Sequence, residues 1–253
     1  MRKPRSERRK KFGQCFMEDP NLLRFEARLA SVEGKRVLEI GAGDGRLTEA
    51  LLQNSPKKIF AAEIDGKFAS VLREKFAGKA VEVIEANFLK IEPPEFDVVV
   101  GNIPYYISSD IIFKLKDMKF ERGVLMVQNE FARKMIAKPS DSNYGRLSVT
   151  SQLFFDVRFE RKVFRHLFRP IPKVDSAIIV IKPTGISLTP FQENIIRYLF
   201  QHKNKKVRNA LLDSKMFDKA ELEVLGAFAK RRVNTLSKED CLEIASILSK
   251  SRV

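Results

Sequence analysis

The feature that most constrains the fold is a glycine-rich turn near the start of the chain, placed between an apolar strand and a helix-like segment. Residues 39–45 are Glu-Ile-Gly-Ala-Gly-Asp-Gly. Glycines at this spacing allow positive φ and let a ligand approach the backbone closely. The dinucleotide fingerprint requires a third glycine where this chain has Arg46, so the turn does not favour an NAD-type pyrophosphate site. The order of strand, turn and helix predicts the first unit of an α/β fold.

A second apolar strand, expected over residues 58–64, ends in two carboxylates roughly 20 residues beyond the glycines. A carboxylate at this strand end can bind both hydroxyls of a ribose. Glu63 is the candidate for that role, whereas Asp65 is better placed to cap the helix that begins near Gly66. The plain alternative for Glu63 is a solvent-exposed strand end.

The tetrapeptide Asn102-Ile103-Pro104-Tyr105 follows the apolar run 98–100. Pro104 fixes its own φ and keeps Ile103 out of the helical region, so the turn is stiff. The Asn102 side-chain oxygen and the Pro104 carbonyl could accept hydrogen bonds from the N–H groups of a planar amino group such as adenine N6. The lone pair of that nitrogen is delocalised into the ring, so the nitrogen is a poor nucleophile until its N–H groups are bound by fixed acceptors. Tyr105 could pack against the base. An ordinary Asn/Pro turn is the alternative explanation.

Strands and helices alternate from about residue 36 to residue 183. The predicted strands are 36–40, 58–64, 81–84, 96–101, 123–128, 153–158 and 177–181. Segments with helical apolar spacing separate the first five strands, which predicts parallel crossovers and a doubly wound sheet. Sheets of this kind bind their ligands at the carboxyl ends of the strands.

After Gly185 the pattern becomes helical, with apolar residues at helical spacing over 191–199, 207–211, 222–228 and 244–248. Gly226 and the loop 231–235 interrupt the helices, and Ser237 is a predicted N-cap answered by Asp240. We therefore expect two domains. The first covers 1–185, with a basic flexible tail over 1–11, and the second is a small all-helical domain over 186–253.

The net charge of +15 and the isoelectric point of about 9.8 predict a polyanionic partner, because cations that neutralise phosphates release counterions. Charge alone leaves RNA, DNA and an anionic membrane open. Cations gather in 2–11, in 161–173 and in 203–208. The second cluster flanks Phe168, where a target strand would enter. The third stands at a helix start, where phosphate binding would explain it and a solvated face is the alternative.

Composition excludes several classes of protein. No apolar segment approaches the roughly 18 residues of a membrane span, and the basic N-terminus lacks a secretory signal, so we expect no membrane partner and a cytoplasmic location. Cys15 and Cys241 suggest neither a disulfide framework nor a metal site, and His166 and His202 fit no catalytic triad. No heptad seam stands out, so we expect a monomer.

Together these motifs resemble the class I S-adenosylmethionine methyltransferases, and among them the small-subunit ribosomal RNA adenine N6,N6-dimethyltransferases. The resemblance covers nearly the whole chain in the family's order. The segments that carry it are 12–17, 39–48, Glu63, 102–105, 127–132, 144–148, 168–176 and 200–211. It implies a Rossmann-like sheet of seven mostly parallel strands with an antiparallel seventh strand, S-adenosylmethionine as cofactor, and a helical C-terminal RNA-binding domain.

The resemblance also implies the site residues. Those expected to bind the cofactor are Gln14, Cys15, Met17, Gly41, Gly43, Glu63, Asn87 and Asn102. Those expected to serve the transfer are Asn102, Pro104, Tyr105 and Phe168, with no metal. Tyr105 and Phe168 would hold the target adenine between them.

The chain departs from the family pattern at three of these positions. Cys15 stands where the family usually has Asn or His, and Met17 stands where it has Leu. Asn87 stands where the family's Asp accepts a hydrogen bond from the cofactor adenine. Asn keeps one acceptor oxygen and loses the charge, so we expect weakened but not abolished cofactor binding.

The implied activity is methyl transfer to N6 of two adjacent adenines near the 3′ end of small-subunit rRNA, within the pre-small ribosomal subunit. Three alternatives stay open. A large-subunit rRNA methyltransferase of the antibiotic-resistance type shares the 102–105 turn, although 203–211 fits the small-subunit branch better. A mitochondrial transcription-factor relative would prefer duplex DNA. A mainly non-catalytic ribosome-assembly factor is suggested by Asn87 alone.

Overall fold

The computed structural model describes residues 15–250 of the 253-residue chain. Gln14 and the basic segment 1–11 lie outside the described residues. The strands are β1 (Phe16–Met17), β2 (Arg36–Ile40), β3 (Lys58–Glu63), β4 (Val81–Glu85), β5 (Val98–Asn102), β6 (Arg122–Gln128), β7 (Phe155–Val163), β8 (Phe168–Arg169) and β9 (Ser176–Pro183). The α-helices are α2 (Pro20–Ala30), α3 (Arg46–Leu52), α4 (Gly66–Lys75), α5 (Ser108–Leu115), α6 (Asn129–Met135), α7 (Arg146–Phe154), α8 (Pro190–Gln201), α9 (Val207–Asp213) and α10 (Lys238–Lys250). Short 3₁₀ segments are η1 (Phe88–Lys90), η2 (Tyr105–Ile107), η3 (Arg165–Leu167), η4 (Glu221–Lys230) and η5 (Val233–Thr235).

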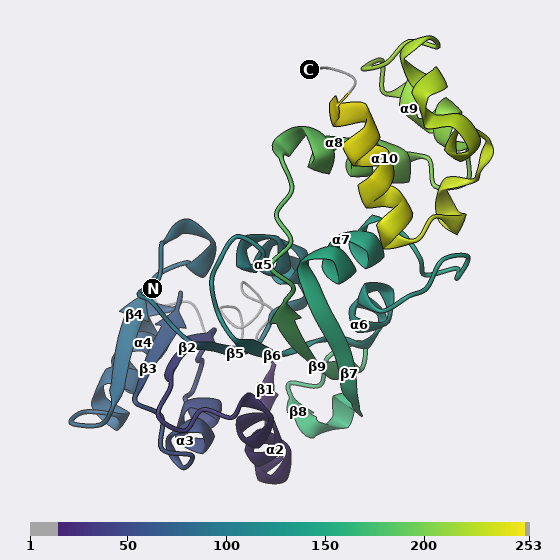
Figure 1. Cartoon of the computed structure of the whole chain (residues 1–253). Coiled ribbons are helices and arrows are strands. Elements are labelled where there is room, and N and C mark those ends of the chain that lie inside the picture. The colour runs from purple at the N-terminus through teal and green to yellow at the C-terminus, as the bar shows by residue number, and fades with distance from the viewer. Residues whose placement is uncertain (1–14, 251–253) are drawn as a thin grey trace, which may run out of the picture. The chain divides into compact units, whose positions relative to one another are not determined.

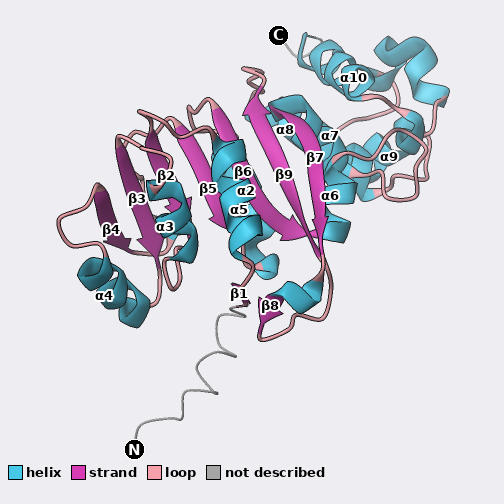
Figure 2. Cartoon of the chain, turned by 90° about the horizontal axis from the view of Figure 1, so that it is seen from below, coloured by secondary structure: helices cyan, strands magenta, loops and turns pink. Residues whose placement is uncertain are grey.

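Seven strands form one sheet in the order β4-β3-β2-β5-β6-β9-β7 (Figure 2). The neighbours from β4 to β6 all pair in parallel, and β9 pairs with β6 in the antiparallel direction. The expected α/β class, with a mostly parallel sheet and an antiparallel seventh strand, is confirmed. This topology brings the ends of β2, β3, β4, β5 and β6 to one edge of the sheet.

The central strands are buried because helices cover both faces of the sheet. Val37, Leu38 and Val99 are fully shielded from solvent, as expected for parallel strands. Figure 1 shows α2 and α3 on one side of the sheet and α5 on the other. Helix α2 begins where the Asp19 carboxylate accepts a hydrogen bond of 2.8 Å from the Asn21 amide.

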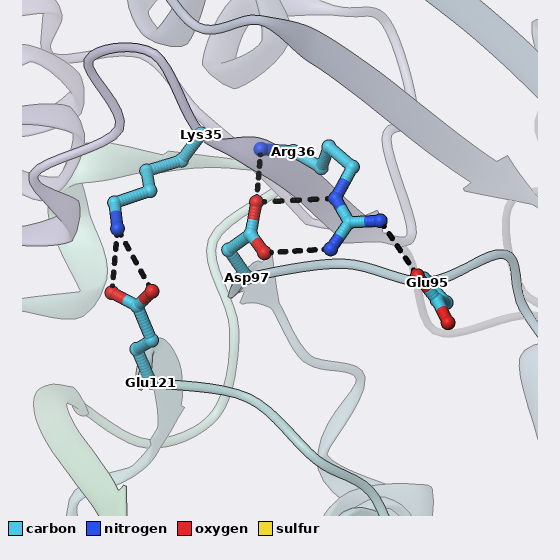
Figure 3. Close-up of polar contacts among 5 residues, drawn as sticks. All are labelled: Lys35, Arg36, Glu95, Asp97 and Glu121. Carbon is cyan, nitrogen blue, oxygen red and sulfur yellow. Dashed lines mark hydrogen bonds and ion pairs between the residues drawn. The ribbon is translucent and has the colours of Figure 1, made fainter.

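Ion pairs close the edge at which β2, β5 and β6 begin, which we call the amino edge (Figure 3). Arg36 donates from Nε and Nη2 to the two oxygens of Asp97 at 3.2 and 2.8 Å, and from Nη1 to Glu95 at 2.9 Å. Lys35 donates to both oxygens of Glu121 at 2.8 Å. The Arg36 guanidinium lowers the pKa of Asp97 to about 2. Charge is therefore matched by charge along this edge.

The chain forms two compact units. One joins the described residues up to Ala132 with Val157–Pro183, and the other joins Arg133–Asp156 with the residues from Thr184 onward. The break after Pro183 lies close to the boundary expected at residue 185. The second unit, however, also contains α7 and the loop before it, which the expected helical domain over 186–253 left out. The separate binding roles expected of the two domains stay predictions.

The second unit is helical and has its own core, built from α7, α8, α9, α10 and η4. The predicted capping of α10 is confirmed, because the Ser237 hydroxyl accepts from the Asp240 amide at 3.0 Å and Asp240 accepts from the Ser237 amide at 2.8 Å. Gly226 interrupts η4 with a φ of 51°, as expected. The segment itself is 3₁₀ rather than α-helical.

Several strand boundaries differ from their predictions: β5 covers 98–102 against an expected 96–101, and β7 ends at Val163 against an expected 158. The strand expected over 153–158 is β7 and begins at Phe155, because Leu153 and Phe154 are buried as the last residues of α7. A short apolar run fits a buried helix end as well as a strand, and its spacing alone cannot separate the two.

The basic stretch 203–208 is largely paired within the chain. Lys203 donates to the carbonyls of Ser142 and Tyr144 at 3.1 and 3.0 Å. Lys205 pairs with Asp213 at 2.6 Å, and Arg208 pairs with Glu223 at 3.2 Å. These contacts show that the cations stabilise the second unit. The phosphate-binding role expected of them stays a prediction.

Candidate active site

A cavity of about 210 Å³ lies in the first unit, where β2, β3, β4 and β5 end. We call this side of the sheet the carboxyl edge. Every predicted site residue within the described chain lines this cavity: Cys15, Met17, Gly41, Gly43, Glu63, Asn87, Asn102, Pro104, Tyr105 and Phe168. Gln14 lies outside the described residues. Segments far apart in the sequence therefore meet at one place, as the doubly wound topology requires.

The glycine turn forms one wall of the cavity and is held by β3. Gly41 and Gly43 have φ values of 76° and 56°, which residues other than glycine rarely adopt. The amides of Gly41 and Ala42 donate to the Ala62 carbonyl at 2.8 and 3.3 Å. The turn therefore presents its backbone to the cavity in a fixed shape.

Glu63 is buried beside the turn and not exposed at a strand end, so the plain alternative for this residue is wrong. Its side chain is held by two backbone amides, accepting from Gly43 at 2.8 Å and from Asp65 at 2.8 Å. Asp65 caps α4, as expected, by accepting from the Lys67 amide at 2.9 Å. The Glu63 carboxylate is therefore fixed in orientation before any ligand binds.

Asn87 lies at the end of β4 and lines the cavity. Its Oδ1 accepts a hydrogen bond of 3.0 Å from the Leu89 amide and caps η1. The acceptor oxygen expected to meet an adenine amino group is therefore already in use once, with one lone pair left.

The Asn102-Ile103-Pro104-Tyr105 turn continues directly from β5. The Pro104 carbonyl accepts from the Ile107 amide at 3.1 Å and from the Ser108 hydroxyl at 3.4 Å. The Tyr105 hydroxyl lies 2.7 Å from the Ser176 hydroxyl, and burial raises the pKa of Tyr105. The turn is thus anchored by its own hydrogen bonds on one side and by β9 on the other.

The side-chain oxygen of Asn102 is buried and has no hydrogen-bond partner in the described structure. The Asn102 side chain does hydrogen-bond to Glu26, and because Oδ1 is unpaired the donor is Nδ2. The amide is thereby oriented with its nitrogen toward Glu26, which leaves its oxygen free to accept a hydrogen bond. A buried acceptor without a partner is rare and marks a place where a donor is missing.

Sequence reasoning missed Glu26. This carboxyl is only 1% exposed on α2, and burial raises its pKa to about 8. The signal was present, since Glu26 shares the buried helix face with Leu22, Leu23 and Ala30. A carboxylate on an apolar stripe is unusual enough to mark a functional site.

A second buried carboxyl, Glu39, lies at the end of β2. Its Oε2 accepts a hydrogen bond of 2.6 Å from the Thr48 hydroxyl, and burial raises its pKa to about 8. The charges of Glu39 and Glu26 disfavour one another, and Glu63 adds to the effect on Glu39. The carboxyl edge therefore buries two carboxyl groups that no cation of the described chain pairs with, and a positively charged ligand would stabilise their ionised forms.

The segment before α2 reaches the cavity through a two-stranded sheet, in which Met17 of β1 lies opposite Phe168 of β8. Arg46 fixes this segment to the glycine turn, donating to the Met17 carbonyl at 3.0 Å and pairing with Asp44 at 3.1 Å. Cys15 is half-buried beside it, and burial raises the pKa of the thiol.

Two aromatic residues differ in how they meet the cavity. Phe168 is 4% exposed and belongs to the core as well as to the cavity wall. Tyr106, which sequence reasoning did not single out, is 64% exposed and lies at the rim. The neighbouring Tyr105 drew attention because it belongs to the tetrapeptide.

Residues 15–250 contain neither a metal-binding cluster nor a membrane-spanning helix. No three His, Cys, Asp or Glu side chains in this range group closely enough to hold a metal ion. No helix in the same range combines the length and apolar character needed to cross a membrane.

The chain is similar to known rRNA methyltransferases over nearly its whole length. The model of the ribosomal RNA adenine dimethylase family matches residues 5–250. A protein named ribosomal RNA small subunit methyltransferase A from Thermococcus kodakarensis is 40% identical, with 95% of this chain and 90% of that protein covered. Its namesake from Pyrococcus abyssi is 37% identical, with 96% and 93% covered.

Solved structures agree with the sequence relatives. A dimethyladenosine transferase from Plasmodium falciparum superposes with a TM-score of 0.83 at 30% identity, covering 94% of this chain and 98% of that one. The 23S rRNA methyltransferase ErmE superposes with a TM-score of 0.69 at 31% identity, covering 92% and 99%. The chain therefore belongs to the ribosomal RNA adenine dimethylase family and is an rRNA adenine dimethyltransferase.

Proposed function

We propose that this enzyme transfers methyl groups from S-adenosylmethionine to N6 of two adjacent adenines near the 3′ end of small-subunit rRNA, giving N6,N6-dimethyladenosine during ribosome biogenesis. The observation that carries the chemistry is the unpaired, buried Oδ1 of Asn102 at the cavity. Leaving such an acceptor without a partner costs free energy. An amino group held in the cavity would supply the missing donor.

The residues around the cavity fit S-adenosylmethionine. Glu63, held by two backbone amides, suits a pair of ribose hydroxyls, and the turn at Gly41 and Gly43 admits a ligand close to the backbone. Asn87 would meet the adenine. The buried carboxyls Glu26 and Glu39 suit a cationic centre. When bound, the cofactor supplies an electrophilic methyl group.

Asn102 would prepare the target nitrogen for attack. Its Oδ1 accepts one N–H of the adenine amino group, which opposes delocalisation of the nitrogen lone pair into the purine ring. Glu26 serves this step by holding Nδ2 of the same amide, so that the oxygen and not the nitrogen faces the target. Asn102 cannot take up a proton, so the displaced proton leaves to solvent.

The Pro104 carbonyl is the second acceptor that the sequence suggested. It already accepts from the Ile107 amide at 3.1 Å, while the Ser108 hydroxyl contacts it more loosely at 3.4 Å. A carbonyl oxygen carries two lone pairs, so the second N–H of the target would compete with the Ser108 hydroxyl alone. Asn102 is therefore the principal acceptor in this proposal.

Tyr105 and Phe168 would contact the two faces of the target base. Stacking of this kind is worth roughly 1–3 kcal/mol per base. Positioning of the reactants can contribute about 7–11 kcal/mol in well-oriented reactions, so a fixed pocket needs no strong base. Because Phe168 is also a core residue, truncating it would cost stability as well as base capture.

The small-subunit assignment is favoured over the large-subunit alternative by two observations. The relatives at 37–40% identity carry the small-subunit name. The dimethyladenosine transferase superposes with the higher TM-score, 0.83 against 0.69 for ErmE. We also propose that the pre-small ribosomal subunit is the substrate particle, and that the enzyme acts on it as a cytoplasmic monomer.

The test is to incubate the purified protein and labelled S-adenosylmethionine with under-methylated small ribosomal subunits and with large subunits, then to map the labelled nucleotides by mass spectrometry. We expect dimethyladenosine at two adjacent positions near the 3′ end of the small-subunit rRNA. Label on the large subunit alone would reject the assignment. Tight binding to small subunits without label, at saturating cofactor, would favour an assembly factor instead.

A further inference from the structure

A second cavity in the first unit lies next to the candidate active site. Gln128 at the end of β6 pairs with Ser176 at the start of β9. Ser176 lines the active-site cavity, whereas Gln128 and the adjacent Asp175 line the second one. One pair of strand ends therefore separates the two cavities.

The second cavity carries an exposed aromatic pair. The rings of Phe164 and His166 stack with their centroids 5.8 Å apart and their planes 14° from parallel. Phe164 is 51% exposed, and the neighbouring apolar side chains Ile171 and Val174 are 57% and 43% exposed. Apolar surface gathered in this way on a strongly basic protein marks an interaction site.

Polar groups without partners lie beside the aromatic pair. The Asn129 side-chain oxygen is buried and unpaired. The side chains of Gln128 and Lys173, which also line the cavity, have no hydrogen bond or ion pair within the described part of the chain. An amide oxygen, an amide and an ammonium group together can bind the edge of a base and a phosphate.

Asp175, one of the two acidic residues that line this cavity, is neutralised by its neighbours. It pairs with Lys162 at 2.8 Å and accepts from the Arg165 amide at 3.0 Å. These contacts hold the pKa of Asp175 below its usual range. Glu130 also lines this cavity, on its α6 side, and is engaged in interactions of its own.

We propose that the second cavity binds the nucleotide next to the target adenine, with its base on the Phe164–His166 pair, its edge at Asn129 and its phosphate near Lys173. The inference rests on the proposed function, because it needs a single-stranded rRNA segment in the adjacent active site. A stacked aromatic surface flanked by cations is the usual equipment for holding an unpaired base.

The test is a coupling experiment between the protein and the RNA. An RNA hairpin that contains the two adjacent adenines is prepared intact and with an abasic nucleotide on either side of the target. Dissociation constants are measured by fluorescence anisotropy for the wild type and for Phe164→Ala. We expect Phe164→Ala to weaken binding of the intact RNA about 5- to 100-fold, and to have no effect on one of the two abasic RNAs.

Control variants separate stacking from charge. Phe164→Trp should keep tight binding, because indole also stacks on a base. Lys173→Ala should weaken all three RNAs by a similar factor, since a phosphate contact does not depend on the base. Lys119→Ala removes the same charge from an exposed position in the loop before β6, and should change little.

The subsite is refuted if Phe164→Ala weakens the intact RNA and both abasic RNAs equally, or weakens none of them. The proposed function is judged separately, by whether the wild type methylates an adenine in small subunits. Methylation without coupling in the hairpin rejects the subsite alone, and absence of methylation rejects the function on which it rests.

Discussion

The two edges of the central sheet treat charge in opposite ways. At the amino edge, Asp97 and Glu121 each face a cation that matches them, and the pKa of Asp97 is lowered to about 2 (Figure 3). At the carboxyl edge, Glu26 and Glu39 are buried without cations, and their pKa values rise to about 8. Ionised carboxylates are thus stabilised at one edge of the sheet and destabilised at the other.

This difference shows that the charged groups of the amino edge stabilise the fold, whereas those of the carboxyl edge cost it stability. The amino edge needs only to close the sheet, so each charge can be given a partner. The carboxyl edge must leave room for ligands, and its unpaired groups, such as Asn102 Oδ1, await donors that the protein itself does not supply. Titratable groups with shifted pKa values around a cavity are typical of a functional site, where some stability is given up for ligand binding.

The largest expected effect comes from removing the unpaired acceptor. Asn102→Ala should lower the methyl-transfer rate about 10²- to 10³-fold, by analogy with the loss of one fixed hydrogen-bonding group at a reacting centre. Binding of S-adenosylmethionine, measured by calorimetry, should change far less. An unchanged turnover number on small ribosomal subunits would show that the carboxyl edge does not work as proposed.

Glu26→Gln tests whether the buried carboxyl orients Asn102. A glutamine amide can also donate to Asn102 Oδ1, so we expect the turnover number to fall about tenfold at pH 8. Glutamine carries no charge, so the variant should bring no loss of stability at that pH. A variant with wild-type turnover would remove Glu26 from the mechanism.

The pH dependence of stability supplies a second measure of the same contrast. The pKa values of Glu26 and Glu39 are raised from 4.5 in the unfolded chain to about 8 in the folded one, so the folded state keeps protons that the unfolded state has lost. The free energy of unfolding should therefore fall as pH rises from about 4.5 to about 8. Denaturant titrations of Glu26→Gln across this range should show a shallower fall.

At the amino edge we expect the free energy of unfolding to depend on pH with the opposite sign and less strongly. Asp97→Asn should lower the free energy of unfolding by about 1 kcal/mol near neutral pH, because it leaves Arg36 without its bidentate partner at a partly exposed site. The Asp97 contribution should be present above about pH 4 and be lost as pH falls through about 2. Turnover at neutral pH should stay at the wild-type value, and a slower variant would contradict the contrast between the two edges.

The smallest expected effect concerns the cofactor. Asn87→Asp should tighten S-adenosylmethionine binding by about threefold to tenfold, because a charged acceptor hydrogen-bonds more strongly than an amide. The cap on η1 should survive, since Asp accepts from the Leu89 amide as Asn does. Calorimetry would measure the change in affinity. Equal or weaker binding of S-adenosylmethionine would mean that residue 87 does not accept a hydrogen bond from the cofactor adenine.

Much of this could be predicted from local pattern. The glycine turn, the Asp65 cap and the Ser237–Asp240 capping pair depend on residues within a few positions of one another, and all are present in the structure. The start of β7 was placed two residues early, because an apolar run does not reveal where a buried helix ends. Glu26 could have been found from its place on the apolar face of α2, but its contact with Asn102, 76 residues away in the sequence, could not.

By itself, the sequence determined the α/β class, the order of the strands along the chain and the residues that could do chemistry, because these follow from hydrophobic period and from motifs that are continuous. Tertiary structure alone decided that Glu26 of α2 meets Asn102 of β5, and that Asn102 Oδ1 stays unpaired. It also decided which carboxylates are matched by cations and which are buried without them. Desolvation and hydrogen bonding depend on what surrounds a side chain in space, and no local pattern of residues carries that information.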